Sequence, residues 1–242
     1  TEISLPAWWD PSEPYCLVPA TNGLSGYWGR NHLDDDGIPP DDAFRTLHGT
    51  YPVGGPFDDN SFRNVSGSGA VNEGLVGAGI SPILMSSYTY FMLAEASLTL
   101  NTTGSARDYL ETGIRQSIGT VMDFGASLAE GTGFVPTSTA VDNHIAEILA
   151  AYDAGNDTDK LRIIVEQYFI ALWCNGIEAY NTYRRTGQPD NLTPAFTTND
   201  PGPFLRSMWY SQTAADSNTN ITQKSAPSTP VFWDTNPDGF VD

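Results

Sequence analysis

Aromatic side chains with polar neighbours are the first groups in this sequence that could carry chemistry. Two aromatic pairs occur within the first 28 residues, in a stretch rich in proline and glycine. Sugar rings stack their C–H faces on flat aromatic rings, and loops carry binding function more often than packed helices do. The alternative is that these rings pack loops onto an apolar core, as aromatic rings often do. With their polar neighbours, the candidate ligand-binding residues are Trp8, Trp9, Tyr27, Trp28, Arg30 and Asn31.

An acidic run follows the aromatic pairs. Its aspartates could surround a calcium ion, because hard cations prefer several carboxylate and carbonyl oxygens and Gly37 allows a tight turn. The run lacks the D-x-D-x-D-G spacing and the distal glutamate of a calcium loop. A solvated acidic loop is therefore the favoured interpretation, with calcium as the alternative and no other cofactor indicated. The candidate calcium ligands are Asp34, Asp35, Asp36 and Asp41.

Residues arranged for catalysis are scarce. His32, His48 and His144 are far apart in the sequence, and neither an H-E-x-x-H nor a G-x-S-x-G motif is present. A glycoside hydrolase would need two carboxylates about 5–10 Å apart, which a sequence alone does not show. We therefore predict that the protein is not an enzyme and keep a hydrolase as the least favoured hypothesis.

Charge and cysteine content restrict the partners and the fold. Eleven basic and 29 acidic residues give a formal net charge of −18, so the basic stripe of a nucleic-acid-binding surface is missing. The sequence has no run of about 18 apolar residues, so no membrane span is predicted. Cys16 and Cys174 are too few for a disulfide framework. We expect Cys174 to be free and packed in an apolar helix, with a bridge to Cys16 as the alternative.

The strongest structural pattern is a helical one over residues 157–189. Asp157 or Thr158 could cap its start, and Gly176 either kinks the helix or divides it in two. Arg184 stands in the last turn, where we expect it to partner a loop carbonyl or carboxylate. Gly187 and a following proline end the helix. Apolar residues recur along one face, at Leu161, Ile164, Val165, Tyr168, Phe169, Leu172 and Trp173.

Part of this helix carries a resemblance. Its residues 167–189, QYFIALWCNGIEAYNTYRRTGQP, resemble the signature of the SusD/RagB-like family of outer-membrane nutrient-binding lipoproteins. The segments RTLHGTYPVGG (residues 45–55) and SPILMSSYTYFMLAEASL (residues 81–98) also resemble family segments, in the same order. The resemblance implies a mainly α fold, a SusD-like α/α (tetratricopeptide-like) helical scaffold with long irregular loops and few short strands.

Three segments follow from the pattern and the resemblance together. Residues 1–80 form a loop-rich segment, with a short strand expected around residues 44–51. Residues 81–188 form a helical core whose first helix pair is tetratricopeptide-like, and residues 189–242 form an irregular C-terminal segment of the same domain. The core helices are expected over residues 81–100, 105–122, 137–152 and 157–189. Rings that match structural segments of the family are expected to pack, namely Trp173, Phe204, Trp209, Phe232 and Trp233.

The resemblance also implies a function. Proteins of this family bind oligosaccharides, or in some relatives peptides, at the outer-membrane surface, where a lipid anchors them. They pass the ligand to a SusC-like TonB-dependent transporter. The lipidated cysteine and the N-terminal helical half of such proteins are not recognised in this sequence, so we expect the C-terminal half of a longer protein. The alternative is a structural half that docks to the transporter while the N-terminal half of the same protein holds the ligand.

Overall fold

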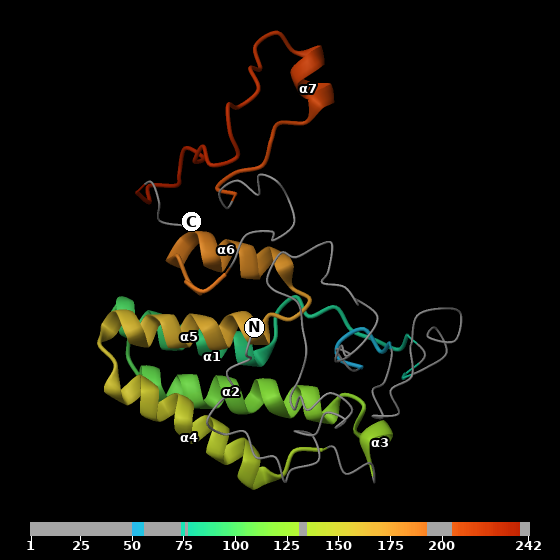
Figure 1. Cartoon of the computed structure of the whole chain (residues 1–242), viewed down its shortest axis with the longest axis vertical. Helices are drawn as coiled ribbons and strands as arrows, with labels where there is room; N and C mark the ends of the chain where they lie inside the picture. Colours follow the sequence, from blue (N-terminus) through green and yellow to red (C-terminus); the bar gives the residue numbers. More distant parts are fainter. Residues whose placement is uncertain (1–49, 56–73, 76, 131–134, 193–204, 238–242) are drawn as a thin grey trace, which may run out of the picture. The chain divides into compact units, whose positions relative to one another are not determined.

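The computed structural model describes residues 50–55, 74–75, 77–130, 135–192 and 205–237. Contacts divide these residues into two compact units, the first ending at Glu178 and the second beginning at Ala179. The described residues form helices, turns and irregular segments, and none of them is in a strand (Figure 1). The prediction of a mainly α fold is therefore confirmed. The expected strand over residues 44–51 lies mostly outside the described residues, and Tyr51 is in a turn.

Four long helices build the first unit. In Figure 1 they lie side by side: α1 packs against α2 and α5, and α4 packs against both α2 and α5. The predicted helix–turn–helix is therefore present as the α1–α2 pair. The helices are α1 (Ser86–Thr99), α2 (Ala106–Asp123), α3 (Ala126–Ala129), α4 (Ser138–Ala154), α5 (Asp157–Ala171), α6 (Gly176–Thr186) and α7 (Gln212–Ser217).

Polar side chains fix the starts of three of these helices. The Ser105 side chain accepts from the backbone N–H of Asp108, and Thr137 caps α4 in the same way. The start of α5 corrects our prediction of Asp157 or Thr158, because Asn156 is the capping residue. Its side chain accepts from two backbone N–H groups, and Asp159 accepts from the N–H of Asn156 in return. This reciprocal pair satisfies donors that an uncapped helix would leave open.

The first helix begins later than its pattern predicted. We expected a start at residue 81, but α1 begins at Ser86. Leu84, whose spacing fits the apolar face of the helix, precedes it and is largely exposed. The periodicity is still correct inside the helix, where Tyr88 and Phe91 are buried.

Aromatic rings from distant helices meet in the core of the first unit. The ring of Tyr168 on α5 stacks on Phe91 at 5.6 Å between centroids and meets Tyr88 edge-on at 5.7 Å. All three side chains are almost fully buried. Around them lie aliphatic side chains from α2, α4 and α5, including Leu110, Ile114, Ile145, Leu149, Ile163, Ile164 and Val165.

A glycine lets α1 and α2 approach closely. A β-carbon at Gly113 would lie 3.1 Å from the ring of Phe91, which is closer than ordinary van der Waals contact. A larger residue would require the ring of Phe91 to move by a few tenths of an ångström within a densely packed interior. The small residue therefore sets the spacing at which the aromatic core closes.

The long predicted helix is divided in two near Gly176. α5 ends at Ala171 and α6 begins at Gly176. In the turn between them, Cys174 has a positive φ of 67°. The side chain of Asn175 accepts from the N–H of Glu178 and donates to the carbonyl of Ile83. Cys174 is free, but it is exposed, so the prediction that it packs in an apolar helix is wrong.

The hydroxyl of Tyr88 generates a stability prediction. Among the described residues this buried oxygen has no hydrogen-bond partner, whereas the neighbouring hydroxyl of Tyr168 donates to Glu178 at 3.4 Å. A buried polar group without a partner costs about 1–3 kcal/mol. We therefore expect Tyr88→Phe to keep or raise the free energy of unfolding, measured by chemical denaturation. The matched control Tyr168→Phe should lower it by up to about 1 kcal/mol. If Tyr88→Phe clearly lowers the free energy of unfolding, the Tyr88 hydroxyl must make a hydrogen bond, and the claim that it has no partner is wrong.

Alkaline pH gives a second test of the same group. Burial raises the pKa of Tyr88 to about 12. Between pH 10, where an unfolded tyrosine ionises, and about 12, the folded chain holds a proton that the unfolded chain has lost. Stability is therefore fully present below pH 10 and falls as the pH rises towards 12. We expect Tyr88→Phe to make this fall shallower in thermal-melting curves, and an unchanged slope would argue against burial of the hydroxyl.

Candidate functional site

The residues chosen from sequence as ligand or metal sites cannot be placed. They all lie outside the described residues, so the structure leaves both predictions as they stand. Among the residues that are described, no three His, Cys, Asp or Glu side chains are grouped so as to hold a metal ion. The sequence-based candidates concerned are Trp8, Trp9, Tyr27, Trp28, Arg30 and Asn31 for the ligand and Asp34, Asp35, Asp36 and Asp41 for calcium.

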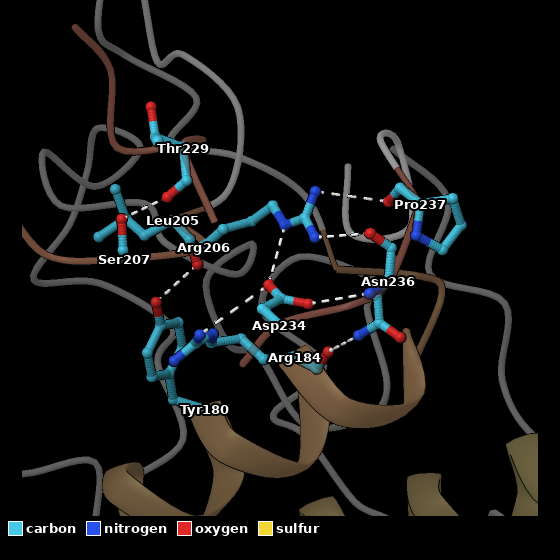
Figure 2. A network of polar contacts seen from close by, with 9 residues as sticks. All are labelled: Tyr180, Arg184, Leu205, Arg206, Ser207, Thr229, Asp234, Asn236 and Pro237. Carbon is cyan, nitrogen blue, oxygen red and sulfur yellow. Dashed lines mark hydrogen bonds and ion pairs between the residues drawn. The ribbon is translucent and has the colours of Figure 1, made fainter. Parts of the chain in front are cut away.

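A connected group of polar side chains in the described part of the second unit centres on Asp234. Its carboxylate accepts from Nε of Arg206 at 3.1 Å, and the guanidinium of Arg184 lies 4.0 Å away (Figure 2). The side chains of Asp234 and Arg206 are 7% and 5% exposed, respectively. A carboxylate removed from water in this way needs a partner of opposite charge, and Arg206 supplies it. Arg184 thus partners a carboxylate, as predicted.

Backbone oxygens satisfy the remaining donors of Arg206. Figure 2 shows its two terminal nitrogens reaching the carbonyls of Asn236, at 2.9 Å, and Pro237, at 3.4 Å. The Asn236 side chain in turn donates to the carbonyl of Arg184 on α6 at 3.0 Å. The bonds from Arg206 are charge-assisted and therefore stronger than neutral ones, and they hold the segment after Asp234 to Arg206. The neutral bond from Asn236 joins the same segment to the end of α6.

The segment that contains Arg206 is held from both sides. The backbone N–H groups of Arg206 and Ser207 both donate to the carbonyl of Pro227 at 3.0 Å, and the Ser207 hydroxyl donates to the carbonyl of Thr229. The hydroxyl of Tyr180 on α6 donates to the carbonyl of Leu205 at 2.6 Å. Residues 205–237 of the tail therefore have a defined conformation although α7 is their only helix and none of them is in a strand.

The hydrogen bond from Arg206 also governs the titration of the carboxylate. It lowers the pKa of Asp234 below the usual value of an aspartate, and the backbone N–H of Asn236 and the charge of Arg184 act in the same direction. Asp234 is therefore ionised at neutral pH. The stabilisation that it provides is present above about pH 4 and is lost as the pH falls through the lowered pKa of the folded state.

The tail aromatics differ from our prediction that they pack. Phe232 and Trp233 are 93% and 65% exposed, and Trp209 is 49% exposed. Trp173 in the first unit is also more than half exposed, and Phe204 lies outside the described residues. Phe232 and Trp233 contact each other edge-to-face, with ring centroids 4.4 Å apart.

Sequence reasoning missed these rings because their hydrophobicity alone indicates burial. The signal that could have identified them is local: Pro230 and Pro237 flank the segment, and proline is typical of turns and loops. A backbone hydrogen bond from Asp234 to Val231, 2.9 Å long, closes a turn with Phe232 and Trp233 at its two central positions. The side chains at the apex of such a turn point away from the chain that supports it.

A shallow groove of about 300 Å³ lies between α2 and α4 of the first unit. Two arginines line it, but carboxylates already bind both. Arg107 donates to Asp153 at 2.8 Å, and Arg115 donates to Glu111 and to Asp142. These side chains are partly exposed, so the ion pairs add little stability. Because its charges are satisfied, the groove is a weaker candidate for ligand binding than the exposed rings.

Removal of the buried charge tests the network. We expect Asp234→Asn to lower the stability of the second unit by about 2–3 kcal/mol, because it leaves two arginines without their carboxylate. Hydrogen exchange at the amides of Arg206 and Ser207 should become faster. The control is Asp216→Asn on α7, where an exposed carboxylate accepts from the Gln212 side chain. Equal protection in both variants would contradict a central role for Asp234.

Comparisons with known proteins identify a family and several similar solved structures. Residues 78–228 match the family model described as SusD-like, Susd and RagB outer membrane lipoprotein. No curated protein matches the chain. One similar solved structure is a SusD-like protein from Bacteroidetes, at 24% identity and a TM-score of 0.41, with 50% of this chain and 22% of that one covered.

A SusD homologue from Bacteroides fragilis is 20% identical with a TM-score of 0.47, and the match covers 55% of this chain and 29% of that one. A structure named a chitin-binding protein is 24% identical with a TM-score of 0.44, and the match covers 61% of this chain and 32% of that one. The chain thus spans about a third or less of the length of these structures. Because the family model matches more than half of the 242 residues, the chain belongs to the SusD-like family.

Proposed function

We propose that this chain is part of a non-catalytic nutrient-binding protein at the cell surface, which captures glycans for a TonB-dependent outer-membrane transporter of the SusC type. The observation that carries the proposal is the family match over residues 78–228, which includes most of the first unit and much of the second. The family description names outer membrane lipoproteins, which supports a lipid-anchored position at that membrane. No helix in the described part of the chain has the length and apolarity to cross a bilayer.

Binding without chemistry is consistent with how the charged groups are used. Arg206 neutralises a buried carboxylate, Arg162 pairs with Glu166 one helical turn away, and both arginines of the groove are engaged by carboxylates. These ion pairs have structural roles. In this proposal the protein binds its ligand reversibly through ring stacking and polar contacts. The transporter then moves the ligand across the outer membrane.

Charge favours a neutral ligand. The net charge of −18 repels polyanions, whereas an uncharged oligosaccharide pays no such electrostatic cost. A peptide is the alternative ligand class. Within this proposal the loop residues named from the sequence, from Trp8 to Asn31, supply stacking faces and hydrogen bonds, and calcium at the acidic run stays a prediction.

A scaffold role is the second candidate function. The matched region amounts to 22–32% of the length of three similar structures, so a longer protein of this kind has ample chain elsewhere to hold a ligand. This half would then dock to the transporter while the N-terminal half binds the glycan. The two functions differ in whether this chain binds sugar by itself.

Calorimetric titration with a panel of oligosaccharides separates them. The panel covers plant, host and microbial glycans, including chitin oligosaccharides, with short peptides as a second class. We expect saturable binding of one glycan class. The variants Trp8→Ala, Trp9→Ala and Trp28→Ala should each weaken it about tenfold if their rings stack on the sugar.

Circular dichroism of each variant serves as the folding control. Binding that survives all three substitutions would remove the loop tryptophans from the site but leave the glycan-binding function. No response from the folded chain to any glycan or peptide would favour the scaffold role. Release of reducing ends by the chain alone would contradict the non-catalytic proposal.

A further inference from the structure

Asn175, in the turn between α5 and α6, combines a reactive sequence with a structural role. Among the asparagines that the structure describes, it alone precedes a glycine. The backbone nitrogen of the next residue can attack an asparagine side chain, and glycine has no β-carbon to obstruct that approach. Gly176 is exposed, and even an added β-carbon there would meet no other part of the chain within 4 Å. The surroundings therefore leave room for the attack.

Two hydrogen bonds hold the side chain of Asn175 in the folded chain. Its oxygen accepts from the backbone N–H of Glu178 at 3.2 Å, and its nitrogen donates to the carbonyl of Ile83 at 3.2 Å. Gly176 is the first residue of α6, so the helix restrains the attacking nitrogen as well. The side chain is free to turn towards that nitrogen only when the turn opens locally, an event that needs less free energy than global unfolding.

We propose that Asn175 and Gly176 form a site of spontaneous deamidation, which proceeds when the α5–α6 turn opens. The nitrogen of Gly176 gives its proton to solvent and forms a bond to Cγ of Asn175. The bond between Cγ and Nδ2 then breaks, and ammonia leaves with a proton taken from solvent. A water molecule opens the resulting cyclic imide and leaves aspartate or isoaspartate at position 175. The reaction consumes only water and is independent of the ligand that the protein binds.

The aspartate product changes one of the two hydrogen bonds. Its carboxylate still accepts from the N–H of Glu178, and its negative charge suits the N-terminal end of α6. It has no N–H to donate to the carbonyl of Ile83, and the two oxygens repel each other. The turn therefore loses its tie to the segment before α1 while α6 keeps its cap. Because the change is covalent, the original closed turn does not form again.

Peptide mass spectrometry of the whole chain, incubated at mildly alkaline pH, measures the conversion. We expect Asn175 to convert faster than the other described asparagines. Peptide mapping separates it from Asn22, which also precedes a glycine but lies outside the described residues. In denaturant, Asn175 should convert at least about tenfold faster than in the folded chain, because the two hydrogen bonds no longer restrain it. The matched variant Gly176→Ala should slow the conversion in denaturant, since its β-carbon hinders the attack.

Asn175→Asp reproduces the aspartate product and tests the consequence. Hydrogen exchange at the amides of Tyr88 and Thr89, which bond to the carbonyl before α1, should become faster, whereas the amide of Glu178 should stay protected. Unchanged exchange at Tyr88 and Thr89 would overturn the loss of the tie. Equal conversion rates in the folded and denatured chains would overturn the control by the turn. If Asn175 keeps its amide while another described asparagine converts, the deamidation site itself is wrong.

Discussion

A carboxylate withdrawn from water destabilises a protein unless a positive group accompanies it, and the second unit is organised around this constraint. Asp234 supplies the carboxylate, and Arg206 and Arg184 supply the compensating charge from two other parts of the chain. Few apolar side chains are buried in the described part of this unit, so polar bonds fix the conformation that a hydrophobic core would otherwise fix. The hydrogen bonds that Asp234 and Arg206 make offset the cost of desolvating their charges. The tail is therefore ordered without regular secondary structure.

In the first unit, apolar packing rather than a polar network fixes the conformation. Its helices bury three aromatic rings against aliphatic side chains, and a glycine on α2 lets them approach. Burial of apolar area drives this packing, and the helix caps settle where each element begins. The chain thus combines one unit held by hydrophobic contact with another held by charge and hydrogen bonding.

Helical periodicity was sufficient to predict the four long helices of the first unit, because burial of one face repeats at a fixed interval. It did not predict the four-residue helix α3, which is too short to show a period. It could not place the ends of the long helices: Asn156 lies just outside the apolar pattern, and α1 begins after Leu84 although that residue fits the period. The sequence predicted that Arg184 would partner a loop carbonyl or carboxylate, but the carboxylate is 50 residues further along the chain and only the fold identifies it. Exposure of Phe232 and Trp233 was not predictable from hydrophobicity, because it follows from their place at the apex of a turn.

The aromatic contact between α1 and α5 has a consequence for how the chain is made. Tyr88 and Tyr168 are separated by 80 residues, so their contact forms only after a long segment has been synthesised. Such distant contacts slow folding relative to local ones. The α1–α2 pair can assemble early, but its apolar face stays open to water until α5 arrives. During synthesis, this interval is when the chain depends most on being shielded from aggregation.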